Sequence, residues 1–383
     1  MKRLGILTGG GDVPGLNAAI KMVTELAIRD GYEVFGFRKG WHAPLNLIPE
    51  EGADNSQYVI PLTIEVVRKV SRSGGTFLHS SRTNPVNVSE KDCPARFKDN
   101  VKVFPADLTS EVIKNLNFMK IETLVTIGGD DTLSFSGRLN REGFKVVAIP
   151  KTMDNDVEGT DYCIGFATAV TRGVDLVTAF RTPVGSHERI GIIEVMGRYA
   201  GFTSWYIGYL AEIDRVIIPE VPFSQQRLAE FLKQDRLKSP SKYSLVVISE
   251  GATEEGGDIS SHSSEKDAYG HKKLSGIGER TTDHIKKITG VHVMFQNLGY
   301  LLRSGEPVSF DRMVAKTYGI LAYQQVRAGN FGVMTAIRDG KYGLVDLNKI
   351  SGKSRKLDIK RLYHEHDYKP EIKEVLGLPM FGY

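Results

Sequence analysis

The sequence predicts an α/β protein whose mostly parallel sheets are covered by helices on both faces. Short apolar and β-branched runs alternate with longer helical patterns, which is typical of repeated strand–helix units. The runs are continuously apolar rather than alternating, as expected of strands buried on both faces. Glycines, carboxylates and cations come directly after most of these runs. Because ligands of open α/β sheets bind at the carboxyl ends of the strands, these turns predict one polar site there.

Each of the clearest strand candidates is placed by an apolar run and by the polar turn after it. The first run stops at TGGGD, the third at GGDD and the fourth at PKTMDND, while the fifth and sixth stop at MGR and SEGA. Helical patterns come after several of these turns, at 16–29, 133–141 and 168–180. The strand candidates are 4–7, 34–37, 123–127, 146–149, 190–195 and 245–248.

Length and composition indicate a globular protein with room for two lobes around one cleft. The chain has 383 residues, of which 41% are hydrophobic and 25% charged. No apolar run approaches the roughly 18 residues of a membrane helix, and the first run is too short for a signal peptide. Two cysteines, Cys93 and Cys163, form no disulfide framework. We therefore expect a cytoplasmic protein that binds no membrane.

Three polar segments carry no recognisable motif. The segment 253–273 is rich in glycine and serine, which favours an exposed loop. The run 349–361 is basic, but no aromatic residues interleave with it, so a solvated surface is favoured over a nucleic-acid site. The residues after about 349, with Tyr363, His364 and His366, are expected to be a structural tail. The net charge of +4 is mild and suits an enzyme with phosphate ligands.

The first strand–turn–helix motif points to phosphate binding. Three successive glycines, Gly9, Gly10 and Gly11, stand between a strand and a helix, where backbone amides and the helix dipole favour an anion. No Gly-Lys-Ser/Thr comes after them, which argues against a Walker loop. Pro14 replaces the third glycine of the dinucleotide fingerprint, which argues against a dehydrogenase. A plain tight turn is the alternative.

Two further motifs add a metal site and a candidate base. GGDDT places Asp130 and Asp131 together at a glycine turn, where Mg²⁺ would relieve their repulsion, since it takes one or two carboxylates with phosphate oxygens. The alternative is a helix N-cap without metal. PKTMDND offers the cation Lys151 and the carboxylates Asp154 and Asp156 within six residues. A turn built from Asp and Asn side chains is the alternative there.

These motifs, in this order, resemble the phosphofructokinase family. TGGGDVPGLNA, GGDDT, PKTMDND, EVMGRYAG, ISEGA and SGEPVSFDRMVA occur at roughly the family's spacing, over about residues 3–330. The resemblance implies two Rossmann-like α/β lobes with the active site in the cleft between them, at the carboxyl ends of the strands. It divides the chain into a donor lobe (1–165 with 302–350), a sugar-phosphate lobe (166–301) and a tail (351–383) that packs on the smaller lobe.

The resemblance also implies a role for each motif residue. Asp130 would hold Mg²⁺ and Asp154 would accept the proton of the sugar hydroxyl, while Lys151, Arg82 and Arg198 would stabilise charge on the transferring phosphoryl group. The donor would lie against Gly10, Gly11, Asp131, Lys151 and Arg82. The sugar phosphate would contact Thr152, Asp154, Asp156, Met196, Gly197, Arg198, Glu250, Tyr300 and Arg303. Because Arg189 would reach the sugar phosphate of a neighbouring subunit, a homodimer or homotetramer is expected.

Two positions make pyrophosphate the expected donor. ATP users of the family resemble GGDG where this chain has Asp131, a carboxylate that would repel an α-phosphate. Lys151 stands where glycine is usual, and its ammonium can pair with pyrophosphate. The expected reaction moves a phosphoryl group reversibly from pyrophosphate to the 1-hydroxyl of fructose 6-phosphate, in glycolysis or gluconeogenesis. Its products would be fructose 1,6-bisphosphate and phosphate.

The sequence leaves alternatives open for the identity of the acceptor and for the function. Met294 replaces an arginine, and Tyr300 a histidine, of the family's 6-phosphate site, so one cation of that site is missing. Another sugar phosphate, such as sedoheptulose 7-phosphate, is the competing acceptor. An ATP-dependent kinase that tolerates Asp131 is a further alternative. A non-catalytic regulatory paralogue is the alternative of another class, against which the retained Asp130 and Asp154 argue.

Overall fold

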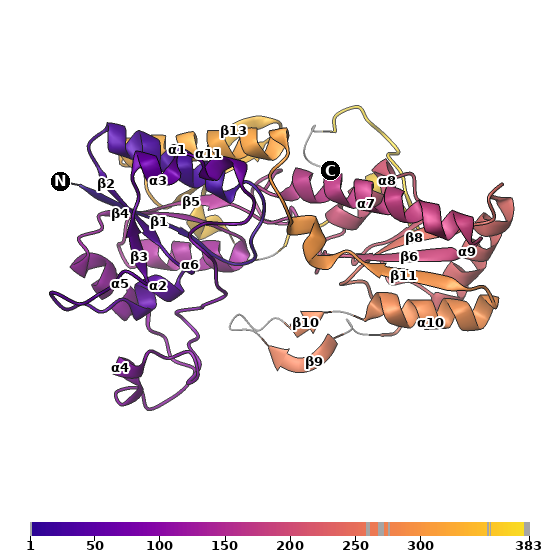
Figure 1. The fold of residues 1–383 in the computed structure, drawn as a ribbon, viewed down its shortest axis with the longest axis horizontal. Helices are drawn as coiled ribbons and strands as arrows, with labels where there is room; N and C mark the ends of the chain where they lie inside the picture. The colour runs from indigo at the N-terminus through magenta and orange to yellow at the C-terminus, as the bar shows by residue number, and fades with distance from the viewer. Residues whose placement is uncertain are drawn as a thin grey trace.

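The computed structural model describes residues 2–257, 261–266, 272–274, 276–350, 352 and 354–378. Two α/β lobes, each with its own sheet, lie side by side (Figure 1). Helices cover both faces of each sheet, which confirms the predicted fold class. Within these ranges, none of the helices combines the length and the apolar character needed to cross a membrane.

The first lobe is built on a seven-stranded sheet in the order β13-β12-β5-β4-β1-β2-β3. The five inner strands are parallel, whereas β13 and β3 run antiparallel to their neighbours. Successive side chains of a strand point to opposite faces, so Leu4 and Ile6 enter one core and Leu7 enters the other. The strands are β1 (Arg3–Thr8), β2 (Glu33–Phe37), β3 (Val59–Pro61), β4 (Thr123–Gly128), β5 (Val146–Pro150), β12 (Val333–Arg338) and β13 (Lys341–Asp346).

Two groups of helices bury the faces of this sheet. One face is covered by α1 (Leu16–Arg29) and α11 (Ser309–Ala328), which pack against each other (Figure 1). The other face is covered by α2 (His42–Asn46), α5 (Thr109–Phe118) and α6 (Asp130–Arg141). The short helices α3 (Ile64–Val67) and α4 (Ala95–Lys98) and the 3₁₀ turns η1 (Val70–Arg72) and η3 (Leu347–Lys349) complete the lobe.

The second lobe has a four-stranded, fully parallel sheet in the order β11-β6-β8-β7. Its strands are β6 (Ile190–Val195), β7 (Arg215–Ile217), β8 (Ser244–Ser249) and β11 (Val293–Asn297). Its helices are α7 (Phe166–Ser186), α8 (Phe202–Leu210), α9 (Gln225–Lys238) and α10 (Ile277–Thr289), and the 3₁₀ turn η2 (Gly299–Arg303) comes after β11. Figure 1 shows α7 and α10 on opposite faces of the sheet.

The six strands and three helices expected from the sequence are all present, but two expectations for polar segments need correction. The segment 253–273 contains a strand, β9 (Ser261–Lys266), which pairs antiparallel with β10 (Lys272–Leu274). It is therefore not simply a loop, although 258–260 and 267–271 lie outside the described residues. The basic run 349–361 does not lie wholly on a solvated surface, because its Arg355 is largely buried.

The last described residues return across the second lobe. The main chain of Val216 in β7 donates to Tyr368 O at 2.8 Å, and the indole of Trp205 in α8 donates to Leu362 O. Tyr368 Oη accepts hydrogen bonds from Ser224 N at 2.9 Å and Arg227 Nε at 2.8 Å. This C-terminal segment includes α12 (Ile359–Leu362) and the paired strands β14 (Tyr363–His364) and β15 (Lys369–Pro370).

Candidate active site

A cavity of about 1960 Å³ lies where turns from the two lobes face each other. Turns after β1, β4 and β5 supply one wall, and turns after β6, β8 and β11 supply the other. The sequence-predicted residues that line it are Gly10, Gly11, Arg82, Asp130, Asp131, Lys151, Thr152, Asp154, Asp156, Met196, Arg198, Glu250, Tyr300 and Arg303. The polar site expected at the strand carboxyl ends is therefore present as one cavity.

The triple-glycine turn supports the donor side of this cavity. Gly10 has a φ of +78°, a conformation that favours glycine. Its amide donates to Ser81 O at 3.0 Å, so Gly10 forms the turn and does not present its N–H to a ligand. Gly11 lies against the guanidinium of Arg303, where an added Cβ would come within 2.8 Å of Nη1. In this structure, the expected amide contact to a phosphate can therefore come from Gly11 but not from Gly10.

Lys151 is a nearly buried cation at the base of the cavity. It is only 3% exposed, and its ammonium donates to Gly11 O at 2.5 Å. Burial, together with the nearby Arg303 guanidinium, lowers the pKa of Lys151 to about 8. Arg82 also contributes to this lowering and lines the same cavity from an exposed position. The donor side of the cavity thus contains at least two cations, Lys151 and Arg82.

Several carboxylates line the same cavity as these cations. Burial and the neighbouring Asp156 and Asp131 raise the pKa of Asp130 to about 8. Burial and Asp154 raise the pKa of Asp156 to about 7, against a hydrogen bond with Ser354. Burial also raises the pKa of Asp154, although the guanidinium of Arg303 opposes this shift. Such crowding of carboxylates is unfavourable without a compensating positive charge.

These carboxylates suit a divalent cation whose coordination is completed by phosphate oxygens. Asp130 Oδ1 and Asp154 Oδ1 are buried and have no hydrogen-bond partner among the described residues. The described ranges contain no cluster of three or more His, Cys, Asp and Glu side chains arranged to hold a metal. Mg²⁺ commonly uses only one or two carboxylates with water and phosphate, so this arrangement suits it when a donor is bound. Asp130, at the first turn of α6, is the residue that would hold it.

The acceptor side is built from the close ends of β6 and β8. Gly251 N donates to Gly197 O at 3.2 Å, and a Cβ on Gly251 would lie 1.8 Å from Arg198 O. Because the turns after β6 and β8 lie this close together, Arg198 and Glu250 both line the cavity. Burial and, to a smaller extent, the charge of Asp154 raise the pKa of Glu250 to about 7. Gly197 shapes the turn, with a φ of +141°, and is not among the described lining residues.

The η2 turn brings further polar groups to the acceptor side. The guanidinium of Arg303 lies 5.5 Å from the centre of the Tyr300 ring, and its Nε donates to Met153 Sδ at 3.4 Å. Tyr300 is 74% exposed, so its hydroxyl is accessible to a ligand. Met294 lies in β11 beside Gly191 of β6 and packs against the core. It is not among the described residues that line the cavity.

Arg189 is a predicted contact residue that the structure places far from this cavity. It precedes β6, whereas the cavity lies beyond the other end of that strand. Its backbone N–H donates to Val184 O at 3.0 Å, which ties it to the end of α7. A role for Arg189 in sugar-phosphate binding therefore requires the site of another subunit, as the sequence prediction assumed.

Among the lining residues that sequence reasoning missed are two groups from separate segments of the chain. The segment 74–81 precedes Arg82 and closes the donor side, with Ser80 Oγ donating to Gly10 O at 2.5 Å. Its signal is the glycine pair Gly74 and Gly75, where a Cβ on Gly74 would lie 1.8 Å from Gly305 O. The second group is Ser354 and Lys356 from the C-terminal segment. The only signal for it was the basic run 349–361.

Known proteins are similar to this chain in sequence and in architecture. The sequence model described as Phosphofructokinase matches residues 3–326. A Thermoproteus tenax protein named pyrophosphate–fructose 6-phosphate 1-phosphotransferase is 38% identical over 92% of this chain and 94% of its own. A Streptomyces coelicolor protein named ATP-dependent 6-phosphofructokinase 3 is 33% identical over 90% of this chain and 93% of its own. The solved pyrophosphate-dependent phosphofructokinase of Nitrosospira multiformis shares the fold, with a TM-score of 0.78, 18% identity and coverage of 99% and 95%.

Proposed function

Because the chain belongs to the phosphofructokinase family, we propose that it transfers a phosphoryl group from pyrophosphate to the 1-hydroxyl of fructose 6-phosphate. The products are fructose 1,6-bisphosphate and phosphate, and the reaction is reversible. The observation that carries the choice of donor is Asp131, which lines the cavity beside Asp130 at the start of α6. A carboxylate there repels an α-phosphate, so the shorter donor is favoured.

The cavity residues divide the chemistry between positioning and proton transfer. Lys151, Arg82 and Arg198 align pyrophosphate and stabilise the charge that develops on the transferring group. Asp130 would hold Mg²⁺, which would supply positive charge against the donor phosphates. Asp154 accepts the proton of the sugar hydroxyl, and its raised pKa makes it a better base than an exposed carboxylate.

The acceptor is the second half of the proposal. Glu250, Thr152, Asp156 and Met196 line the cavity and would contact the sugar, and Tyr300 and Arg303, which also line it, would contact the sugar phosphate. Since Met294 supplies no cation there, a second candidate acceptor is another sugar phosphate, such as sedoheptulose 7-phosphate. We further propose that the enzyme works in the cytoplasm, where free thiols such as Cys93 and Cys163 are the usual state.

The test compares donors on the parent enzyme and on two substitutions at Asp131. With fructose 6-phosphate and Mg²⁺, the parent should turn over pyrophosphate well and ATP poorly. Asp131→Gly removes both the charge and the bulk, so the ratio of kcat/KM for ATP to that for pyrophosphate should rise by about 100-fold. Asp131→Asn keeps the size and removes only the charge, so it separates repulsion from steric exclusion.

Either of two results would contradict the proposal. A parent enzyme that prefers ATP would show that Asp131 does not select the donor. Turnover of sedoheptulose 7-phosphate with a higher kcat/KM than fructose 6-phosphate would replace the acceptor and leave the donor assignment standing.

A further inference from the structure

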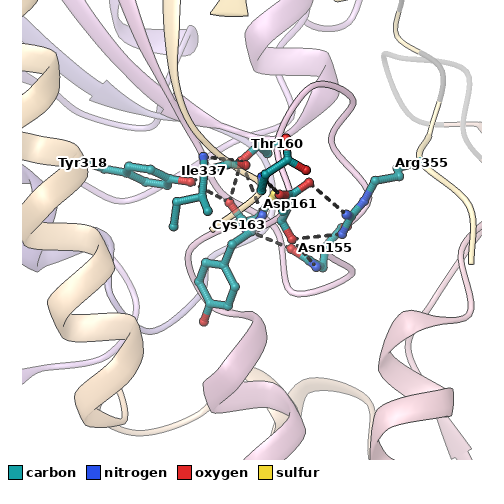
Figure 2. A network of polar contacts seen from close by, with 9 residues as sticks. Asn155, Thr160, Asp161, Cys163, Tyr318, Ile337 and Arg355 are labelled. Atoms are coloured by element: carbon teal, nitrogen blue, oxygen red, sulfur yellow. Dashed lines mark hydrogen bonds and ion pairs between the residues drawn. The ribbon is translucent and has the colours of Figure 1, made fainter. Parts of the chain in front are cut away.

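The loop that carries Lys151, Asp154 and Asp156 is held by a network of polar contacts around Asn155, Asp161 and Arg355, which Figure 2 shows. The chain leaves the first sheet after β5 and returns at Ile164, which forms a parallel bridge with Lys151. Between these points lies the catalytic loop, residues 151–164. The positions of its cavity-facing side chains depend on the contacts that hold this loop in place.

Asn155 lies within the catalytic loop. It has a φ of +53°, a left-handed conformation that Asn tolerates better than most residues. Its side chain is 2% exposed and spans the loop, because Nδ2 donates to Asp161 O at 3.0 Å and Oδ1 accepts from Cys163 N at 2.8 Å. The neighbours on either side are Asp154 and Asp156, so the conformation of Asn155 sets the directions of both carboxylates.

Arg355 reaches this point from the C-terminal segment (Figure 2). Its Nη2 donates to Asn155 O at 2.9 Å and to Asp161 O at 3.1 Å. Its backbone N–H donates to Asp156 O at 2.7 Å. One residue therefore binds three main-chain carbonyl oxygens of the catalytic loop, two beside the catalytic carboxylates and one on the returning side.

The surroundings of Arg355 suit a guanidinium and not a generic cation. Its side chain is 20% exposed, and the guanidinium lies 4.5 Å from the centre of the Phe202 ring. Nη1 lies 3.9 Å from Asp161 Oδ1. A planar fork can stack on an aromatic ring and donate in several directions at once, which an ammonium cannot do. Arg355 also lies beyond residue 326, where the match to the family's sequence model ends.

We propose that Arg355 is a positioning residue, which holds the catalytic loop through Asn155 and Asp161 so that Asp154 and Asp156 face the sugar hydroxyl. This inference rests on the proposed role of Asp154 in phosphoryl transfer. Arg355 is not among the described residues that line the cavity, although its neighbours Ser354 and Lys356 are. Loss of its two guanidinium hydrogen bonds displaces the loop, and misplacement of a reacting group by about 1 Å can cost on the order of 100-fold in rate.

The test measures kinetics and loop opening on the same proteins. Arg355→Ala should lower kcat by about 100-fold while KM for pyrophosphate changes by less than about threefold, because positioning acts mainly on the chemical step. Amide hydrogen exchange in a peptide covering 151–164 should become about tenfold faster. Arg355→Lys keeps one donor and should lie between the alanine variant and the parent. Guanidinium chloride at about 20 mM should partly restore kcat of the alanine variant only.

A matched control is Lys360→Ala, which removes an exposed cation from the same segment and should change neither readout. Unchanged exchange in 151–164 overturns the proposal, as does a folded Arg355→Ala enzyme with kcat within about threefold of the parent. If the alanine variant does not fold, the same two criteria apply to Arg355→Lys. If the parent turns over no sugar phosphate with any donor, the proposed function fails, and hydrogen exchange alone decides whether Arg355 holds the loop.

Discussion

Lys151 is a charged side chain with almost no contact with solvent. Burial lowers its pKa to about 8, and its ammonium is held by a single backbone carbonyl, that of Gly11. A cation in this environment interacts strongly with an anion that enters the cavity, because little water screens it. The same environment makes its charge sensitive to modest changes of pH.

The pH dependence of pyrophosphate use should report this residue. A lysine with a lowered pKa loses its proton as pH rises through that value, so the positive charge is present below about pH 8 and is lost above it. We expect kcat/KM for pyrophosphate to fall above about pH 8. Lys151→Arg keeps a cation that does not titrate in this range, so this alkaline decrease should disappear. An identical decrease in both enzymes, measured side by side, would assign it to another group.

The positions of many site residues could be predicted because they depend on local order in the chain. Asp130, Lys151 and Glu250 each come soon after a buried strand, and the carboxyl ends of those strands line one cavity. Contacts between distant segments could not be predicted in this way. Arg355 is about 200 positions from Asn155 in the chain, and a basic residue in a polar run carries no signal for a carbonyl partner. The engaged amide of Gly10 likewise depends on Ser81 in a separate loop.

At the scale of elements, Asp311 connects two long helices. It lies in the first turn of α11, and it accepts hydrogen bonds from Thr168 N and Gly165 N at 2.7 Å each. Thr168 Oγ1 and Tyr162 Oη donate to it as well, at 2.6 and 2.7 Å. The side chain is fully buried, and burial raises its pKa despite these donors. Asp311 thus satisfies the free amides at the start of α7.

Asp311→Asn should destabilise the fold substantially. The amide has one acceptor oxygen, so its NH₂ group would face donors that the carboxylate now satisfies. Leaving buried donors unpaired in this way should cost about 2–4 kcal/mol in the free energy of unfolding. Urea denaturation followed by circular dichroism measures this change. Asp175→Asn, on the exposed side of α7, is the matched control and should lie within about 0.5 kcal/mol of the parent. Equal stability of the two variants would contradict this account.

The sequence predicted six buried strands of the two sheets, but it missed the long inner strand β12 and the shorter or more exposed strands. β6 and β8 are fully buried and read as apolar runs. β7 has only three residues, and β11 includes exposed polar residues at its end, so neither stands out from its surroundings. β9 and β10 have polar sequences, and they are strands because they pair with each other. Pairing between strands is a tertiary property, and composition alone does not contain it.

At the scale of the whole molecule, the position of Arg189 bears on the proposed assembly of subunits. The cavity opens at the carboxyl end of β6, and Arg189 lies at the opposite end of that strand. We propose a homodimer or homotetramer in which Arg189 of one subunit completes the sugar-phosphate site of another. In a closed symmetric dimer, each subunit would then give one arginine and receive one.

Mixing two inactive variants tests this arrangement. Asp154→Asn removes the base, and Arg189→Ala removes the contributed cation, so each homo-oligomer should be nearly inactive. After unfolding and joint refolding, a mixed dimer contains one site with both groups, and random pairing should restore about a quarter of the parent activity. No recovery, with mixed oligomers verified by differently tagged subunits, would show that Arg189 does not act across subunits. Sedimentation velocity of the parent gives the size of the assembly.

The C-terminal segment contacts both lobes, through Arg355 at the catalytic loop and through Tyr368 at β7. A ribosome makes these residues after every strand of the two large sheets has been synthesised. Domains of a nascent chain generally fold as units, from the N-terminus onward. Both lobes of this protein can therefore fold during synthesis while the loop with Asp154 still lacks the Arg355 contacts. On this view, the contacts that hold the loop with Asp154 form only after the strands of both large sheets have been made.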